Sequence, residues 1–150
     1  MNRQVDGLLL ELNPVFSAPP ERIFALLTEP DGLASWWGPH GFTLPEARLD
    51  LTVGGRYRFT MKPADGDPFH LSGRFLEITP PRRLAYTFNW EEPTPDDRET
   101  TATLTLDVEG SVTRVALWHG LFATEERLAL HRDGWSESFQ KLRRVLESHG

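Results

Sequence analysis

Two histidines are the residues of this sequence best placed to act together. His119 shares the parity of Val115 and Leu117 in an apolar run, so its side chain is expected to point inward. His131 lies about two turns into a helical pattern that begins at Thr124. A strand and helix that run back to back can bring the rings together, where they could orient a ligand carboxylate or act as a general base. The alternative is two partly buried histidines, each satisfied by a hydroxyl, carboxylate or backbone group.

Glu77 is a second candidate acid. It shares parity with Gly73 and Phe75, so it could face the interior, where burial would raise the pKa of its carboxyl group. The alternative is a solvated carboxylate near a strand end that pairs with Arg82 or Arg83.

Aromatic side chains on inward-facing positions are the third feature, drawn from five Trp, nine Phe and two Tyr. Any single ring can simply fill the core, but a helix lying over a curved sheet leaves a volume that rings line better than they fill. The set therefore favours a pocket wall, with Trp37 and Trp90, at the ends of elements, near its mouth. The predicted ligand-binding residues are Trp37, Phe42, Tyr57, Phe59, Phe75, Tyr86, Phe88, Trp90, His119, His131, Trp135 and Phe139.

Several chemistries are disfavoured. The chain has no cysteine, and its five histidines show neither HxH nor HExxH spacing, so no disulfide, thiolate chemistry or metal site is predicted. Nucleophile-elbow, phosphate-loop and dinucleotide-binding motifs are missing as well, so we predict no cofactor and assign no catalytic residue. A formal net charge of −6 disfavours a nucleic-acid partner.

Length and composition indicate a single domain over residues 1–150. A chain of 150 residues that is 39% hydrophobic and 25% charged is typical of a globular protein with one core. The apolar run in residues 1–12 is too short for a signal peptide, and no segment approaches the ~20 apolar residues that span a bilayer. We therefore expect no membrane insertion and a cytoplasmic location. The acidic stretch Glu91–Glu99 is expected to be a solvated loop.

The order of elements suggests how these residues are positioned. Residues 8–16 predict a first strand, and two short helices follow, one after Pro19-Pro20 and one ending near Trp36-Trp37. Period-two alternation with turn signals then predicts six strands, at residues 49–51, 56–61, 69–78, 84–90, 101–108 and 112–119.

A long C-terminal helix, capped by Thr124, presents one apolar stripe made of Leu128, His131, Trp135, Phe139, Leu142 and Leu146. Strands joined by short turns are antiparallel, and this helix is long enough to cover their apolar face. The prediction is an α+β fold in which a curved antiparallel sheet of about seven strands surrounds the helix. Gly73 is expected at a bulge, and Gly134 where the helix approaches another element closely.

Several stretches of the chain, in order, resemble a known family. They are WWGPHGFT at 36–43, DL at 50–51 with GGRYRFTM at 54–61, DG at 65–66, GRFLEI at 73–78, PPRRLAYTF at 80–88, and GW at 134–135 with Ser138, Phe139 and Leu142. Together they resemble the START-like (SRPBCC) superfamily, and within it the bacterial relatives of the activator of the heat-shock-protein-90 ATPase.

This resemblance implies a helix-grip fold with a cavity between sheet and C-terminal helix. It implies little about chemistry, because the superfamily includes lipid carriers, hormone receptors, polyketide cyclases and hydrolases. No shared catalytic motif carries over, and nothing matches the additional domain of the larger eukaryotic relative, so chaperone activation is not predicted.

Three functions are carried forward. The first is binding of a small apolar or amphipathic molecule in the cavity, where a polar group would meet His119, His131, Tyr57 or Tyr86. The second is an enzyme using the same cavity, such as a cyclase, dehydratase or hydrolase on an aromatic or polyketide-like substrate. The third is a co-chaperone-like module or a homodimer that uses a sheet edge or an exposed Trp118, and it predicts a filled core.

Overall fold

The structure, a computed structural model, describes residues 8–148. The residues before position 8, which include part of the segment weighed above as a signal peptide, and His149 lie outside the described residues. In chain order the elements are β1 (Leu8–Leu12), β2 (Val15–Phe16), α1 (Pro20–Thr28), α2 (Pro30–Ala34), β3 (Thr43–Leu49), β4 (Arg56–Lys62), β5 (Phe69–Thr79), β6 (Arg83–Trp90), β7 (Thr100–Glu109), β8 (Val112–Phe122) and α3 (Glu125–Ser148).

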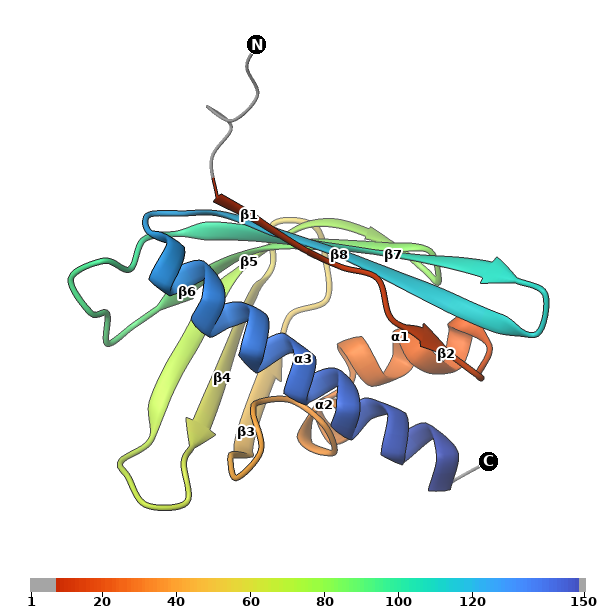
Figure 1. Ribbon diagram of the computed structural model, residues 1–150, viewed down its shortest axis with the longest axis horizontal. Coiled ribbons are helices and arrows are strands. Elements are labelled where there is room, and N and C mark those ends of the chain that lie inside the picture. The colour runs from red at the N-terminus through yellow and green to blue at the C-terminus, as the bar shows by residue number, and fades with distance from the viewer. Residues whose placement is uncertain (1–7, 149–150) are drawn as a thin grey trace, which may run out of the picture.

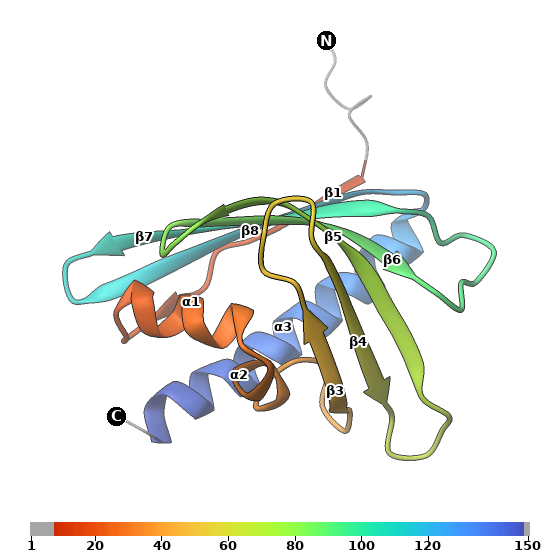
Figure 2. The ribbon, with the colours of Figure 1, turned by 180° about the vertical axis from the view of Figure 1, so that it is seen from behind.

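One antiparallel sheet carries the fold. Its strand order is β1-β8-β7-β6-β5-β4-β3, and β2 pairs with β8. The sheet curves, α3 lies across one face, and α1 and α2 lie beside the C-terminal half of α3 (Figures 1 and 2). The predicted α+β, helix-grip class is confirmed.

The first predicted strand is divided in two. Pro14 falls between β1 and β2, and because proline has no N–H it cannot donate to the ladder. Its carbonyl still accepts from the backbone N–H of Val115 at 2.8 Å. The sheet therefore has eight strands, where the sequence pattern suggested about seven.

The predicted strand at residues 49–51 was wrong. β3 lies earlier, and the chain after Leu49 turns toward β4. Pro45 made this stretch a poor strand candidate, but β3 is the edge of the sheet, and its register shifts between Thr43 and Glu46. Edge strands and bulges are the places where a sheet tolerates proline.

The predicted cap and stripe of α3 are confirmed. The Thr124 hydroxyl accepts a hydrogen bond from the backbone N–H of Arg127 at 3.1 Å, which satisfies one free amide of the first turn. The buried residues of α3 are His131, Trp135, Ser138, Phe139, Leu142 and Leu146. The helix therefore turns its aromatic side toward the sheet.

On β5 the structure corrects the prediction for Gly73 and favours the second of the two alternatives for Glu77, a solvated carboxylate that pairs with an arginine. A Cβ on Gly73 would lie 2.1 Å from the carbonyl oxygen of Thr87, so glycine is needed there for the close approach of β6. The bulge lies further along, between Phe75 and Glu77. This extra residue changes the side-chain alternation, and Glu77, instead of facing the interior, is partly exposed and pairs with Arg83 at 2.7 Å. Glu77 is therefore not a buried acid.

Candidate functional site

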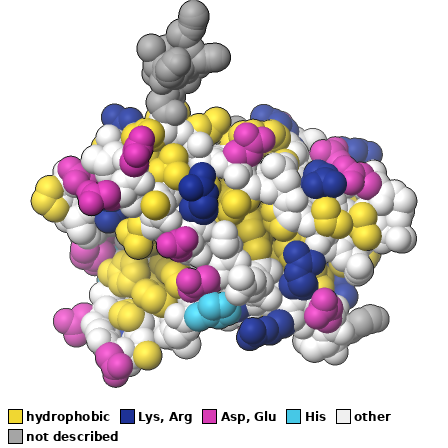
Figure 3. Space-filling view, in the orientation of Figure 1, with side chains coloured by type: hydrophobic (Ala, Val, Ile, Leu, Met, Phe, Trp, Pro, Cys, Tyr) yellow, Lys and Arg dark blue, Asp and Glu magenta, His cyan; other side chains and the backbone are white. Residues whose placement is uncertain are grey.

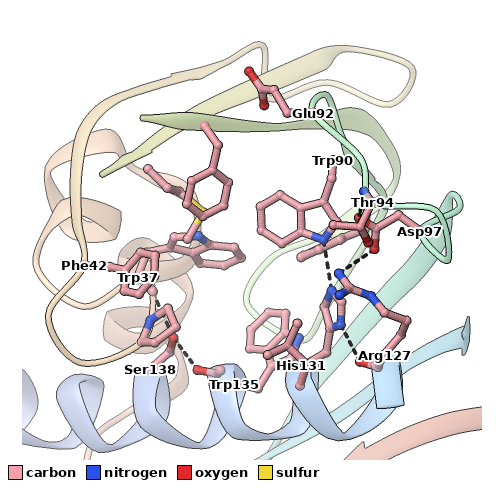
Figure 4. A pocket seen from close by; sticks show the side chains of 17 residues that line it. Trp37, Phe42, Trp90, Glu92, Thr94, Asp97, Arg127, His131, Trp135 and Ser138 are labelled. Atoms are coloured by element: carbon pink, nitrogen blue, oxygen red, sulfur yellow. Dashed lines mark hydrogen bonds and ion pairs between the residues drawn. The ribbon is translucent and has the colours of Figure 1, made fainter. Parts of the chain in front are cut away.

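A cavity of about 330 Å³ lies between α3 and the inner face of the sheet. Its walls come from β4, β5 and β6, the segment 37–42 after α2, the loop 92–97 and the first four turns of α3 (Figure 4). Six aromatic rings line it: Trp37, Phe42, Phe69, Phe88, Trp90 and Trp135. In Figure 3 hydrophobic side chains gather between α3 and β4, at the lower left of the view. The volume is within the usual range for small-molecule pockets, about 300–1,000 Å³.

Half of the predicted binding residues line this cavity, namely Trp37, Phe42, Phe88, Trp90, His131 and Trp135. The structure places the other half in the packed core instead. Four of these rings contact one another at the far end of the inner face: Tyr57, Phe59, Phe75 and Tyr86. His119 and Phe139 are buried deeper, behind the ring of Trp135. Burial raises the pKa of Tyr57 and of Tyr86, so both phenols stay protonated.

Sequence reasoning missed several lining residues. Met61 and Phe69 stand on the same inward faces as the rings it selected, so strand parity was a usable signal for both. Glu92 and Asp97 come from the acidic loop, and Arg127 comes from the first turn of α3. No local pattern marks these charged residues, because only the folded chain brings the loop against the helix.

His119 is fully buried and neutral. Its Nδ1 accepts a hydrogen bond from the indole N–H of Trp135 at 3.0 Å, so the ring proton belongs on Nε2, which lies 2.7 Å from the Thr100 hydroxyl oxygen. Burial, and secondarily the neighbouring His131, holds the pKa of His119 well below its ordinary value.

His131 is the lining member of the pair, and the two ring centroids are 5.5 Å apart. Its Nε2 accepts from the indole N–H of Trp90 at 3.0 Å, and its Nδ1 donates to the carbonyl of Arg127 at 2.7 Å. Burial lowers its pKa, although the Arg127 carbonyl opposes the shift. Both nitrogens of both rings are thus engaged within the protein, an arrangement suited to orienting two tryptophans rather than to proton transfer.

The acidic loop is less solvated than its composition suggested. Asp97 forms an ion pair with Arg127 at 2.6 Å, and its side chain is only 7% exposed. The other carboxylate oxygen of Asp97 accepts from the backbone N–H of Thr94 at 2.9 Å. Glu92 pairs with His70 at 2.7 Å, and this hydrogen bond lowers the pKa of the glutamate. The loop is therefore fastened over one end of the cavity by α3 and by β5.

The opposite wall, residues 37–42, is held by α3. The ammonium group of Lys141 donates to the carbonyls of Gly38 at 3.1 Å and of Trp37 and Phe42 at 3.4 Å. Ser138 accepts from the backbone N–H of Gly38 at 3.0 Å. Partial burial lowers the pKa of Lys141. The wall is positioned by side-chain contacts to α3, since it contains no helix or strand.

Gly134 has a different role from the one predicted. A Cβ there would meet only the ring of Pro39, at 3.8 Å, which is ordinary van der Waals contact. Gly134 instead lines the cavity, where the missing side chain leaves space. Trp118, expected to be exposed, is half-buried on β8 opposite Glu11 of β1.

Among residues 8–148 no three His, Asp or Glu side chains gather as metal ligands would. No helix in the same stretch is long and apolar enough to cross a membrane.

Comparison with known proteins identifies the family. The model of the activator of Hsp90 ATPase homolog 1-like proteins matches residues 17–147. A solved protein of Nitrosomonas europaea is 28% identical with a TM-score of 0.81, and the match covers 95% of this chain and 96% of that one. The AHSA1 protein from Silicibacter pomeroyi is also 28% identical, with a TM-score of 0.81 and coverage of 95% and 99%.

A third structure, from Chromobacterium violaceum, is 26% identical with a TM-score of 0.80, covering 93% of this chain and 96% of that one. No curated protein matches the chain. With the family model spanning nearly its whole length, the chain belongs to the activator of Hsp90 ATPase homolog 1-like family, as its motifs indicated.

Proposed function

We propose that the chain binds a small, largely apolar or amphipathic molecule in the cavity between the sheet and α3. The observation that carries this proposal is the cavity of about 330 Å³ walled mainly by aromatic rings. Apolar walls of this size gain free energy when an apolar ligand replaces water, at about 25 cal/mol for each Å² removed from solvent.

The rival functions receive less support. An enzyme would need converging titratable groups, and the pair offered for that role, His119 and His131, already has its four ring nitrogens in hydrogen bonds. An interaction module predicts a filled core, whereas this protein has a cavity of about 330 Å³ between the sheet and α3.

A binding experiment tests the proposal with one apolar probe, 2-ethylnaphthalene, and one amphipathic probe, the alcohol geraniol. Thermal unfolding is followed beside tryptophan emission, because Trp37, Trp90 and Trp135 line the cavity. A ligand at about 100 times its dissociation constant adds about 2.7 kcal/mol of stability. We expect a higher melting temperature together with a change in emission.

The control is a matched pair at Gly134. Gly134→Leu places a side chain in the cavity and should abolish binding, whereas Gly134→Ala adds one methyl group and should retain it. If neither probe binds the wild-type protein, or if Gly134→Leu binds as well as Gly134→Ala, the proposal is wrong.

A further inference from the structure

Arg127 has hydrogen-bonding capacity that the protein does not use. Its Nη2 reaches Asp97 at 2.6 Å. Its Nε is buried and has no partner among the described residues. A buried N–H group without an acceptor is unfavourable, so such groups are rare in folded proteins. The side chain lies on the wall of the cavity, next to His131 (Figure 4).

The other polar groups of the wall are already engaged. Trp90 and Trp135 donate their indole N–H groups to His131 and His119. The hydroxyl of Ser138 donates to a helix carbonyl at 2.8 Å and accepts from a backbone N–H at 3.0 Å. A polar group of a bound molecule therefore finds its best remaining donor in the guanidinium of Arg127.

The local charge selects the kind of acceptor. The positive charge of Arg127 is balanced by Asp97, and Glu92 lies on the same wall as a second carboxylate. The buried carboxylate of Asp97 would repel a ligand carboxylate across a poorly solvated space. An uncharged acceptor, such as a carbonyl oxygen, takes the N–H without this repulsion. Because Nε is closed to solvent, the guanidinium must turn toward the cavity to donate.

We propose that Arg127 is the polar anchor of this cavity and that the ligand is an uncharged, flat aromatic molecule carrying a carbonyl acceptor. This inference rests on the proposed function, since it assigns a ligand class to the same cavity. The aromatic part of the ligand lies among the rings of Trp37, Trp90 and Trp135, with its carbonyl group directed toward the start of α3.

Three probes with one ring system test the assignment: 2-acetonaphthone, 2-naphthoate and 2-ethylnaphthalene. Dissociation constants are measured by tryptophan emission at neutral pH. We expect the ketone to bind about tenfold more tightly than the hydrocarbon, which corresponds to about 1.4 kcal/mol. The carboxylate should bind more weakly than the ketone.

Variants test whether Arg127 is the residue that makes the ketone bind more tightly than the hydrocarbon. Arg127→Met should remove the preference for the ketone, so that the ratio of ketone to hydrocarbon affinity falls from about ten to about one. Arg132→Met is the matched control, because Arg132 is exposed on the same helix. Asp97→Asn removes the balancing charge while keeping an oxygen for Thr94, so it should raise naphthoate affinity about tenfold. This second variant keeps the test decisive even if Arg127→Met does not fold.

The following outcomes would overturn the inference that Arg127 is the polar anchor. If the hydrocarbon binds and the ketone binds no better, the cavity stands as a binding site and Arg127 is not its polar anchor. A wild-type preference for naphthoate, a ketone preference that survives in Arg127→Met, or an Asp97→Asn variant with unchanged naphthoate affinity also overturns it. Failure of all three probes overturns both this inference and the proposed function.

Discussion

The inner face of the sheet has two ends that share residue types and differ in packing. At one end Tyr57, Phe59, Phe75 and Tyr86 pack against one another, with Leu27 of α1 and Leu33 of α2 beside them, around a remaining space of only about 10 Å³. At the other end the rings surround about 330 Å³. Aromatic side chains face inward at both ends, so the covering elements make the difference.

Side chains on the covering elements explain the contrast. α1 and α2 direct apolar side chains into the packed end, as Leu33, which is 1% exposed, illustrates. Over the open end α3 presents Gly134, and the acidic loop reaches the cavity with polar side chains such as Thr94 and Asp97. An inward aromatic residue is therefore core or pocket wall according to what faces it across the gap.

The largest expected effect separates two phenylalanines of one strand. Phe75, 3% exposed at the packed end, should cost about 3–5 kcal/mol of unfolding free energy when replaced by alanine, through lost burial and a new cavity. Phe69, partly buried on the cavity wall, should cost roughly 1–2 kcal/mol. Urea denaturation of both variants measures the difference, and equal losses would mean that the two ends pack alike.

A pH effect of intermediate size tests the open end, where His131 lines the cavity and contacts the buried His119. Burial lowers both pKa values in the folded state, so the unfolded chain binds more protons as the pH falls below the ordinary value of 6.5. The unfolding free energy should therefore decrease from pH 6.5 to pH 5, by at most about 1.4 kcal/mol per pH unit for each histidine. Urea denaturation at pH 7, 6 and 5 gives the slope.

The control is His131→Gln. This variant should have a smaller pH dependence of the unfolding free energy, and the part that remains is the contribution of the more deeply buried His119. Glu91 and Glu92 have lowered pKa values, so the stability that they contribute is lost at more acidic pH, below 4.5, outside this window. Stability that stays constant or rises between pH 6.5 and 5 would contradict the neutral assignment of the pair.

The smallest expected effect is a gain at Gly134. Alanine there should stabilise the protein by roughly 0.5–1 kcal/mol, because helix propensity improves and the new Cβ meets only Pro39, at 3.8 Å. Thermal unfolding measures the gain, and Ala129→Gly, at an exposed position of the same helix, calibrates the propensity. A loss of stability in Gly134→Ala would show that the helix needs glycine for close approach and not for cavity space.

Much of the fold was predictable, and the errors have local causes. Turn residues and period-two runs located β4 to β8, and Thr124 marked the start of α3, because these signals depend on near neighbours. β3 was misplaced because Pro45 is acceptable only at an edge, and sheet order is not a local property. Parity alone could not decide whether Glu77 faces the interior or pairs with Arg82 or Arg83, because the bulge after Phe75 has no sequence mark, and the pair with Arg83 is the one that forms.

Part of the candidate site could likewise be predicted from the sequence, and part could not. Parity identified rings such as Phe88 and Trp90 because a strand alternates its side chains whatever lies opposite. Parity could not exclude Tyr57 or Phe75 from the cavity wall. The side chains of α1 and α2 that fill the packed end come from a distant segment of the chain, so no local pattern shows this contact. The charged end of the cavity was missed for that reason as well.

Sequence by itself determined the fold class, the family and which side chains face inward, since these follow from local propensity, periodicity and motifs. Tertiary structure alone decided where the inner face is packed and where it is hollow. It also decided that Asp97 meets Arg127, 30 residues away in the sequence, and that two tryptophans donate hydrogen bonds to two buried histidines. Such pairings depend on curvature, register and the placement of covering elements, which emerge when the whole chain closes around its core.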